Sequence, residues 1–297
     1  MMTHPQNLPI SESHRVPDLV EPKRLSEYAR GVFVSLPSRK SVKKAIKSGR
    51  LLVDGRPSYT GHFVRSGEVL TVLRSPEPTA VYDLELRVIF EDDHLAVVVK
   101  PGDLPVGGFM RRNLDNALPG NLTVTSLPDA LPRPVPVHRL DRLTSGLVVV
   151  AKTFSAAAEL GGFFENRRVE KGYLAVVHGI LGAPMRIEHP LDGKEAITEV
   201  APIAEGAHAW GQWTVVNVQP ITGRTHQIRR HLSMESFPIV GDVPYGGKSV
   251  RRGLMLCARK IRFPHPVHGE IPAFEMDLPR KFKSFLRRVA RDSSLGN

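Results

Sequence analysis

The residues with the clearest chemical potential lie in one short stretch, where an aspartate sits between two arginines just before a Thr-Ser-Gly turn. The stretch reads His138-Arg139-Leu140-Asp141-Arg142-Leu143-Thr144-Ser145-Gly146-Leu147. Flanking cations favour the charged form of a carboxylate, so we expect Asp141 to be an anion that serves as a nucleophile or a base. A structural Asp–Arg pair at the start of a strand is the alternative for this pattern taken alone.

The chain is strongly basic, which narrows the class of partner. Its 297 residues include 41 Lys and Arg against 30 Asp and Glu, a formal net charge of +11 at pH 7. Such a surplus attracts polyanions, and nucleic acid is the commonest polyanionic partner. An acidic membrane surface is the competing target, but we find no amphipathic helix with exposed large apolar residues and no lipidation signal. We therefore expect a nucleic-acid partner and no membrane.

Cysteine and histidine usage indicates neither disulfides nor a metal. The single cysteine, Cys257, excludes an internal disulfide and a cysteine-only metal cage. His265 and His268 lack further ligands at a suitable spacing, so no metal is expected. No apolar run approaches the ~18 residues of a membrane span, and the N-terminus lacks the apolar core of a secretory signal. A cytoplasmic, reducing setting fits best, with a monomer as the default oligomeric state.

Composition divides the chain into a small N-terminal module and a larger domain. We expect a disordered segment at 1–22, the small module at 23–74, a proline-containing linker at 75–84 and the larger domain at 85–297. Several strands at short intervals with few long helices predict an α+β fold with a mostly antiparallel sheet. Expected strands are 87–90, 95–99, 173–177 and 213–218, and residues 103–136 are expected to be loop. Helices are expected after caps at Ser155 and Thr225, and near the C-terminus over a buried stripe of Phe282, Phe285, Leu286 and Val289.

The small module has a basic helix. A first helix is expected to bury Leu25, Tyr28, Ala29, Val32 and Phe33. A second, capped by Ser41, would bury Val42, Ala45 and Ile46 and present Lys43, Lys44 and Lys47 on its other side. Strands at 51–53 and 69–73 follow, the first running into an Asp54-Gly55 turn. The pattern from Lys43 to Gly55 resembles the alpha-L RNA-binding domain first described in a small-subunit ribosomal protein. The alternative is that the lysines are only a solvated helix face.

Four further blocks, together with the aspartate motif, resemble a known enzyme family. They are 88–102 (Val-Ile-Phe-Glu-Asp-Asp-His to Lys-Pro-Gly), 170–175 (Glu-Lys-Gly-Tyr-Leu-Ala), 222–246 (Thr-Gly-Arg-Thr-His-Gln-Ile-Arg to Gly-Asp and Tyr-Gly) and 254–266 (Leu-Met-Leu-Cys-Ala to Phe-Pro-His-Pro). In this order, they resemble the pseudouridine synthases of the RluA type over roughly residues 85–280. At Gly253 and Cys257 the chain departs from the family's usual Arg and His, which puts local packing or an RNA contact in doubt.

This resemblance implies an enzyme that isomerises uridine in RNA without a metal or organic cofactor. Asp141 matches the essential aspartate, which attacks the ribose or assists glycal formation while the uracil detaches and rejoins through C5. Tyr173 matches the tyrosine that stacks on the uracil and is a candidate for handling the C5 proton. Arg229 matches the arginine that pairs with the aspartate, and Arg139 the arginine that enters the RNA where the base has left. Arg142, Arg224 and His226 belong to the same two blocks and are expected to contact RNA.

These residue types also fit the chemistry itself. Breaking a glycosidic bond develops positive charge on the sugar, which a carboxylate stabilises or traps. A guanidinium such as Arg229 grips and aims that carboxylate in a fixed fork. An aromatic face such as Tyr173 holds the detached base in more than one orientation. Taken singly, Tyr173 would be a core aromatic, Arg229 and His226 surface positions, and Lys100 a solvated strand end.

Two rival functions remain at this point. A non-catalytic RNA-binding protein derived from the family would retain the fold without turnover. A glycosidic hydrolase would need a second, opposed carboxylate, and only Asp92-Asp93 offers one, in a turn between strands. As substrate, large-subunit ribosomal RNA is the first expectation and transfer RNA the second, by analogy with relatives that carry the small module.

Overall fold

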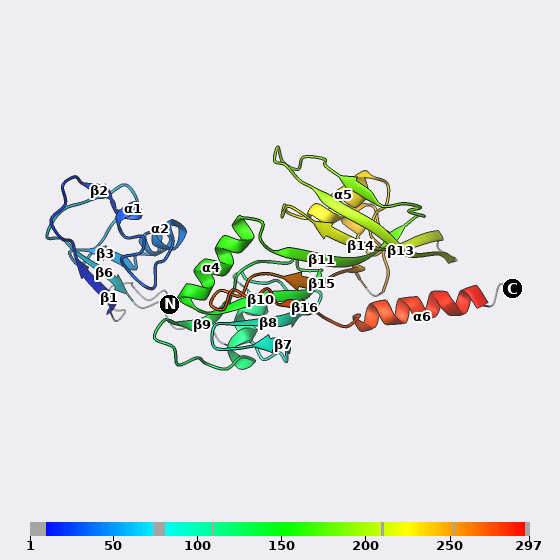
Figure 1. Cartoon of the computed structure of the whole chain (residues 1–297), viewed down its shortest axis with the longest axis horizontal. Helices are drawn as coiled ribbons and strands as arrows, with labels where there is room; N and C mark the ends of the chain where they lie inside the picture. The colour runs from blue at the N-terminus through cyan, green and yellow to red at the C-terminus, as the bar shows by residue number, and fades with distance from the viewer. Residues whose placement is uncertain (1–9, 74–80, 109, 209–210, 252, 295–297) are drawn as a thin grey trace.

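The chain folds into two modules, each with its own sheet and hydrophobic core (Figure 1). The computed structural model describes residues 10–73, 81–108, 110–208, 211–251 and 253–294. Among these, no helix is both long enough and apolar enough to cross a membrane.

The N-terminal module combines a four-stranded sheet with two short helices. The sheet has the order β1-β6-β3-β4, and a separate two-stranded sheet joins β2 to β5. Its elements are β1 (Ile10–Arg15), β2 (Lys23–Arg24), α1 (Leu25–Tyr28), α2 (Arg39–Lys47), β3 (Leu51–Val53), β4 (Arg56–Pro57), β5 (Phe63–Val64) and β6 (Val69–Leu73). The expected strands and the Asp54-Gly55 turn are confirmed, with both turn residues at positive φ (48° and 75°).

The expectation of disorder over residues 1–22 is wrong from residue 10 onward. Strand β1 pairs antiparallel with β6, and Val16, which follows it, is only 1% exposed. A strand at the edge of a sheet takes much of its stability from main-chain hydrogen bonds, so polar side chains conceal it in the sequence. The ordered module therefore begins by residue 10 instead of residue 23, and residues 1–9 lie outside the described part.

Helix α2 has the expected faces but a different cap. Val42, Ala45 and Ile46 are buried, whereas Lys43, Lys44 and Lys47 are exposed. The cap is Ser38, whose hydroxyl accepts from the Ser41 backbone, while the Ser41 hydroxyl accepts from the Ser38 backbone. Ser41 is thus the third helical residue of a reciprocal capping box. Helix α1 is shorter than expected, but Leu25, Ala29 and Phe33 are buried.

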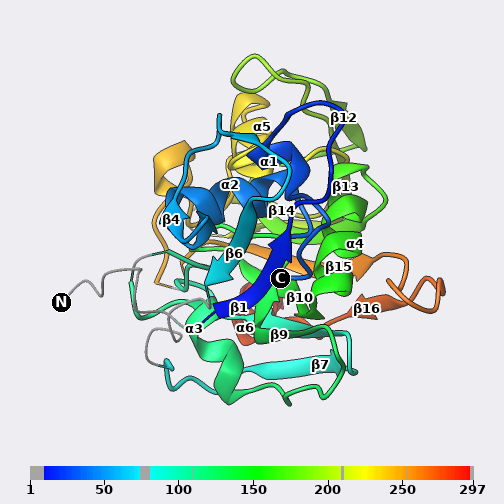
Figure 2. The same ribbon diagram turned by 90° about the vertical axis from the view of Figure 1, so that its left-hand side faces the viewer.

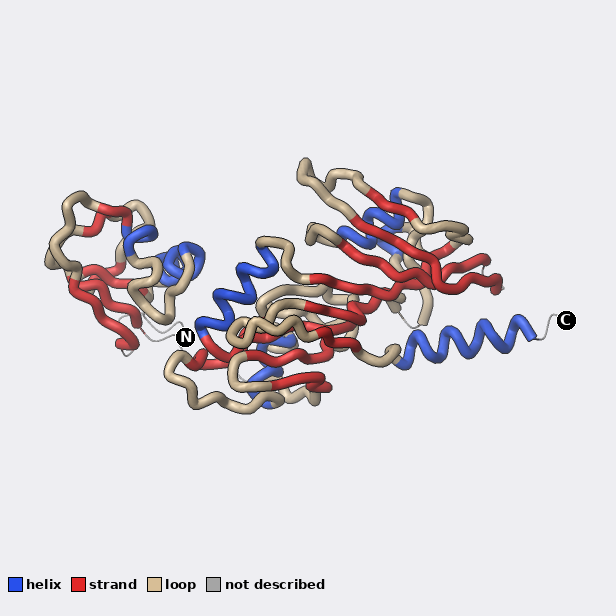
Figure 3. Tube along the Cα trace, viewed as in Figure 1, coloured by secondary structure: helices blue, strands red, loops and turns tan. Residues whose placement is uncertain are grey.

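The larger domain is built on one long, mostly antiparallel sheet, as predicted (Figure 3). Its order is β12-β13-β14-β11-β15-β10-β8-β7, with β16 paired to β15 and β9 to β10. The strands are β7 (Arg87–Glu91), β8 (Leu95–Lys100), β9 (Ala130–Pro136), β10 (Ser145–Thr153), β11 (Glu170–His178), β12 (Met185–Ile187), β13 (Thr198–His208), β14 (Gly211–Pro220), β15 (Leu256–Arg262) and β16 (Ala273–Glu275). The helices are α3 (Leu114–Ala117), η2 (Leu118–Gly120), α4 (Phe154–Glu165), α5 (Gln227–Met234), η3 (Val243–Tyr245) and α6 (Arg280–Ser294).

The helices cover different parts of this sheet. Helix α4 packs against β10 and β9, α5 against β13 and β14, and α6 against β13 (Figure 1). The expected stripe on α6 is confirmed for the buried Phe282 and Phe285 and the partly buried Leu286, whereas the side chain of Val289 lies outside the described part.

Several boundaries in the larger domain differ from expectation. Residues 130–136, expected to be loop, form β9, which lies beside β10 (Figure 2). Its prolines are tolerated because β9 pairs only with β10 and leaves its other edge free of ladder bonds among the described strands. Helix α4 is capped by Thr153 instead of Ser155, and α5 follows His226 without any side-chain cap. Residues 81–84, assigned to the linker, already pack on this domain through Tyr82 and Leu84. The rest of the expected linker, 75–80, is outside the described residues.

The two halves of the sheet meet at Gly146, directly after the aspartate motif. Here β10 pairs in parallel with β15, Gly146 opposite Ala258. Gly146 has φ of 137°, and a Cβ on it would lie 2.3 Å from the Ala258 carbonyl oxygen. Both the backbone angle and the close approach therefore require glycine at this position.

We expect Gly146→Ala to lower the free energy of unfolding by roughly 3 kcal/mol or more, because the methyl group would force β10 and β15 apart. Gly162→Ala in α4 is the matched control, since nothing lies within 4 Å of the Cβ position there. That change should be neutral or stabilising by up to ~1 kcal/mol. Urea unfolding of both variants tests this, and equal stabilities would contradict the crowding argument.

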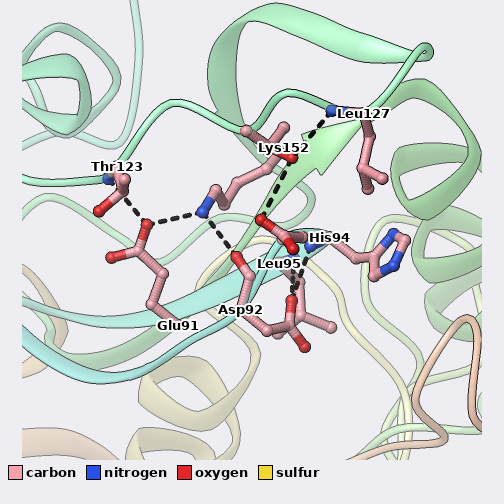
Figure 4. Close-up of polar contacts among 9 residues, drawn as sticks. Glu91, Asp92, His94, Leu95, Thr123, Leu127 and Lys152 are labelled. Atoms are coloured by element: carbon pink, nitrogen blue, oxygen red, sulfur yellow. Dashed lines mark hydrogen bonds and ion pairs between the residues drawn. The ribbon is translucent and has the colours of Figure 1, made fainter.

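A buried lysine fixes the end of β10 to the turn between β7 and β8 (Figure 4). Lys152 Nζ donates to Glu91 Oε1 at 2.7 Å and to the Asp92 carbonyl oxygen at 2.6 Å. The Asp92 carboxylate accepts from the His94 and Leu95 backbone and from His265 Nε2. His265 Nδ1 in turn accepts from the backbone N–H groups of Val267 and His268, so the ring joins the β7–β8 turn to the segment that follows His265. Asp92 and His265 therefore have structural roles.

Candidate active site

A cleft of about 460 Å³ opens where the aspartate motif, the start of β11 and the start of α5 come together. Asp141, Tyr173 and Arg229, which the sequence assigned to one site, all line it. Arg139, Arg224 and His226 line it as well. The sheet topology explains the meeting, because β14, β11, β15 and β10 are neighbours in this order. The aspartate motif leads into β10, Tyr173 lies near the start of β11, and α5 follows β14.

Each oxygen of the Asp141 carboxylate lies near the nitrogen of a different side chain. Oδ2 lies 3.6 Å from Arg229 Nη1, and Oδ1 lies 3.7 Å from His226 Nε2. Both distances exceed a hydrogen bond, so the Arg229 contact is a loose ion pair and the His226 contact a polar one, each with room to tighten. The Asp141 side chain is 22% exposed and therefore remains reachable from the cleft.

Arg229 makes its tightest contact with a residue other than Asp141. Its Nε and Nη2 each donate to the Asp242 carboxylate at 2.7 Å, in a bidentate pair. The Asp242 side chain is fully buried and that of Arg229 only 5% exposed. The expectation that the guanidinium fork grips Asp141 is therefore wrong in this respect. The fork engages Asp242, and the remaining nitrogen, Nη1, is presented to Asp141.

His226 is held by a tyrosine. Its Nδ1 lies 2.8 Å from the Tyr245 hydroxyl, and the two rings meet edge to face. The same Tyr245 ring lies under the Arg229 guanidinium, 4.8 Å from centre to centre. His226 and Arg229 are thus parts of one cluster instead of separate surface positions.

Tyr173 lies in β11, between β14 and β15. The buried hydrophobic residues of the larger domain form two clusters, and Tyr173 packs against both of them. Burial, reinforced by the negative charge of Asp141, raises the pKa of its phenol above the ordinary value. The phenol consequently keeps its proton at neutral pH.

Two side chains, the buried Lys100 and the partly buried His138, fix the loop that carries Asp141. Lys100, at the end of β8, is fully buried, and its Nζ donates to the carbonyl oxygens of Pro101, Leu104 and Arg142. Burial, helped by the charge of Lys281, lowers the pKa of Lys100 to about 8. The interpretation of Lys100 as a solvated strand end is therefore wrong. His138 Nε2 accepts from the Val149 backbone, and its ring stacks on Phe164 at 4.6 Å.

Burial, together with the charge of Lys171, lowers the pKa of His138 to about 4 from the usual 6.5. As pH falls between these values, the unfolded chain binds a proton at His138 that the folded chain does not. This contribution to stability is complete above pH ~6.5 and is lost as the pH falls, at a cost of about 1–2 kcal/mol by pH ~5.

We expect His138→Gln to remove this part of the pH dependence, because glutamine does not titrate and its carbonyl oxygen can accept the same bond. Urea unfolding of wild type and variant at neutral and mildly acidic pH tests it. Parallel curves for the two proteins would contradict the assignment.

The other cations assigned to RNA contacts occupy different places. Arg139 is exposed on the cleft, and Arg224 lines it while donating from Nε to the Glu195 carbonyl oxygen. Arg142 points away from the cleft toward Asp103, 3.3 Å from its carboxylate. Lys43, Lys44 and Lys47 lie on α2 of the other module.

Sequence reasoning missed four residues of the site. Asp242 and Tyr245 belong to the block at 222–246, but neither was expected to have a role there; they contact Arg229 and His226 without lining the cleft. Lys171 and Glu165 line the cleft itself. The sequence feature that could have indicated Asp242 and Tyr245 is the pair of dipeptides Gly-Asp and Tyr-Gly, which mark a tight turn. The two departures from the family pattern are structural. Cys257 is buried with its Sγ 3.9 Å from the Met276 sulfur, and Gly253 has φ of 65° in a turn.

Comparison with known proteins defines the class. Residues 94–234 match the family model for RNA pseudouridylate synthase. An uncharacterized RNA pseudouridine synthase of Aquifex aeolicus is 34% identical over 300 residues, covering 89% of this chain and 93% of that protein. The ribosomal large subunit pseudouridine synthase D of Pseudomonas aeruginosa is 32% identical over 317 residues, covering 95% and 97%.

Solved structures agree with this relationship. Human RNA pseudouridylate synthase domain containing 1 superposes with a TM-score of 0.54 at 27% identity, covering 69% of this chain and 87% of that one. Domain containing 4 gives 0.56 at 25% identity, with 68% and 92% covered. The chain belongs to the RNA pseudouridine synthase family of the RluA type, and it is an enzyme of that class.

Proposed function

We propose that this pseudouridine synthase modifies uridine in large-subunit ribosomal RNA and uses Asp141 as its nucleophile. The observation that carries the proposal is the position of the Asp141 carboxylate, reachable from the cleft and faced by Arg229 and His226. A carboxylate placed this way can attack an electron-poor carbon or accept a proton, and the Arg229 guanidinium and the His226 ring aim its two oxygens.

In the proposed reaction, the bond between uracil N1 and ribose C1′ breaks first. Asp141 either bonds to C1′ or removes a ribose proton to form a glycal, and in both routes it stabilises the electron-poor sugar. The uracil turns within the cleft and a bond forms between C1′ and C5, while the C1′–Asp141 bond breaks in the first route or Asp141 returns the ribose proton to the glycal in the second. The proton on C5 is lost and N1 ends with a proton, so the mass of the RNA is unchanged.

Tyr173 is proposed to hold the detached base. Its raised pKa favours a protonated phenol, which supports a stacking and hydrogen-bonding role in the resting enzyme. The exposed Arg139 at the mouth of the cleft is proposed to fill the gap that the flipped nucleotide leaves in the RNA.

The choice of ribosomal RNA has two supports. The Pseudomonas aeruginosa relative, named for the large ribosomal subunit, matches nearly the full chain, including the small module. That module also presents exposed Lys43, Lys44 and Lys47 on one helix face, suited to phosphates. Because the RNA of bacterial ribosomes is made in the cytoplasm, we place the activity there.

Transcripts carrying tritium at uracil C5 test this function. We expect tritium release from a large-subunit ribosomal RNA transcript and slow or no release from transfer RNA. Isomerisation leaves RNA mass unchanged, hydrolysis would free uracil, and a binding protein would do neither. Release from transfer RNA alone would contradict the choice of substrate.

The basic helix makes a separate prediction. Replacing Lys43, Lys44 and Lys47 with glutamine should weaken RNA binding and reduce the slope of log affinity against log salt, by up to about one unit for each phosphate that the helix no longer neutralises. The triple arginine variant retains the charge and should keep the slope. A glutamine variant with the wild-type slope would mean that this face only meets solvent.

A further inference from the structure

Tyr245 and His226 form a pair whose hydrogen-bond direction matters for Asp141. The Tyr245 hydroxyl lies 2.8 Å from His226 Nδ1, and His226 Nε2 lies 3.7 Å from Asp141 Oδ1. A neutral imidazole carries one proton, so one ring nitrogen is a donor and the other an acceptor. The partner of one nitrogen therefore decides what the other presents.

Only one of the two arrangements suits the carboxylate. If His226 Nδ1 held the proton and donated to Tyr245, the Nε2 lone pair would face the negative Asp141 oxygen, which is repulsive. If Tyr245 donates its hydroxyl proton to Nδ1, the Nε2–H points at Asp141 and attracts it. A phenol hydroxyl can donate or accept, so the cluster is free to adopt the second arrangement.

The backbone of His226 has an unusual conformation, which directs its ring toward Asp141. His226 has φ of 53° and ψ of 26°, a left-handed conformation that costs a non-glycine residue roughly 1 kcal/mol or more. His226 precedes α5, and its side chain makes no hydrogen bond to the N-terminus of that helix. The strained backbone instead directs the ring into the cleft.

One turn anchors both groups that face Asp141. The Asp242 carboxylate binds Arg229, and the Asp242 carbonyl oxygen accepts from the Tyr245 backbone N–H at 3.0 Å. Arg229 Nη1 faces Oδ2 of Asp141 while His226 Nε2 faces Oδ1. The turn from Gly241 to Tyr245 thus sets the positions of both donors.

We propose that Tyr245 is a positioning residue, which donates to His226 Nδ1 and so presents the Nε2–H of His226 to Asp141. Each oxygen of the Asp141 carboxylate then has a dedicated donor, and both donors depend on the Gly241–Tyr245 turn. This inference rests on the proposed role of Asp141, but the hydrogen-bond arrangement is measurable without turnover.

Nitrogen-15 NMR of the histidine rings tests the arrangement directly. At about pH 8, where an ordinary histidine is neutral, we expect His226 to be the Nε2–H tautomer in wild type. The signal is assigned among the 12 histidines of the chain by its loss in His226→Gln. In Tyr245→Phe we expect a mixture of tautomers. An Nδ1–H tautomer in wild type, or an unchanged signal in Tyr245→Phe, would overturn the proposal.

Kinetics supply the second readout. Tyr245→Phe should lower kcat by about 10- to 100-fold with KM unchanged, because it disturbs alignment and not binding. His226→Gln, whose amide offers an N–H, should retain several-fold more kcat than His226→Ala. Tyr28→Phe is the matched control, since it removes a similar 2.9 Å Tyr–His contact with His14 in the other module. Equal kcat in Tyr245→Phe and Tyr28→Phe would overturn the proposal.

The two levels of the proposal can fail separately. If wild-type enzyme showed the expected tautomer but turnover did not depend on Asp141, the nucleophile assignment would fall while the hydrogen-bond arrangement stood. If turnover depended on Asp141 but the tautomer was wrong, only the role of Tyr245 would fall.

Discussion

Asp141→Asn should abolish tritium release, by a factor of at least about 10³, while RNA affinity changes by less than about threefold. The substitution keeps the shape of the side chain and removes its charge and nucleophilicity. The fold should be retained, because the Asp141 contacts at 3.6 and 3.7 Å are longer than hydrogen bonds and Arg229 keeps its pair with Asp242.

Asp103→Asn is the matched control for that experiment. The Asp103 carboxylate lies beside the same motif, 3.3 Å from Arg142, but its side chain is 56% exposed and outside the cleft. We expect this variant to retain full turnover. Tritium release by Asp141→Asn at the wild-type rate would contradict the assignment of the nucleophile. An equal loss of release in Asp103→Asn would indicate that turnover depends only on the negative charge near the motif.

Asp242→Asn should have the second-largest effect, on both stability and turnover. The Arg229 guanidinium would then stay buried without its charged partner. Among the described residues, its nearest remaining carboxylate would be Asp141, 3.6 Å away. Removing one partner of a buried ion pair costs about 3–5 kcal/mol. Turnover per folded molecule should also fall by about 100-fold, because Arg229 is no longer held in place.

The exposed pair of Arg230 with Asp192 is the control. It is also bidentate, at 3.0 and 3.1 Å, but the Asp192 side chain is 70% exposed. Asp192→Asn should change the free energy of unfolding by less than about 1 kcal/mol. Urea unfolding and tritium release for both variants decide the matter. Equal stability of Asp242→Asn and Asp192→Asn would mean that the buried pair is not what fixes Arg229.

Local patterns in the sequence predicted much of the fold. Alternating or continuous apolar residues located the strands β3, β6, β7, β8, β11 and β14, because side chains on a half-buried sheet repeat every second residue. Strand β1 was not predictable in this way, because an edge strand is stabilised by main-chain bonds to β6, which leave no trace in side-chain types. The prolines of β9 favour a loop when only the sequence is considered, yet they suit its place beside β10.

The sequence indicated which residues belong to the site, but not which of them bond to one another. The motifs brought Asp141, Tyr173 and Arg229 together through a family resemblance, and the structure places all three on one cleft. That Arg229 engages Asp242, 13 residues further along, depends on how α5 and the following turn fold back on each other. The burial of Lys100 was equally hidden, because its partners are backbone carbonyl oxygens, which any sequence supplies.

A structure with bound substrate RNA carrying 5-fluorouridine at the target position is the most direct test of the central claim. Fluorine at C5 cannot leave as a proton, so the reaction should halt with the base still in the enzyme. We expect the ribose C1′ of that nucleotide beside the Asp141 carboxylate and its base against Tyr173. A target nucleotide with its C1′ away from Asp141 would contradict the claim, for example one in a second groove, which is lined by Met185, Val200 and Asn217 and shares only Tyr173 with the cleft.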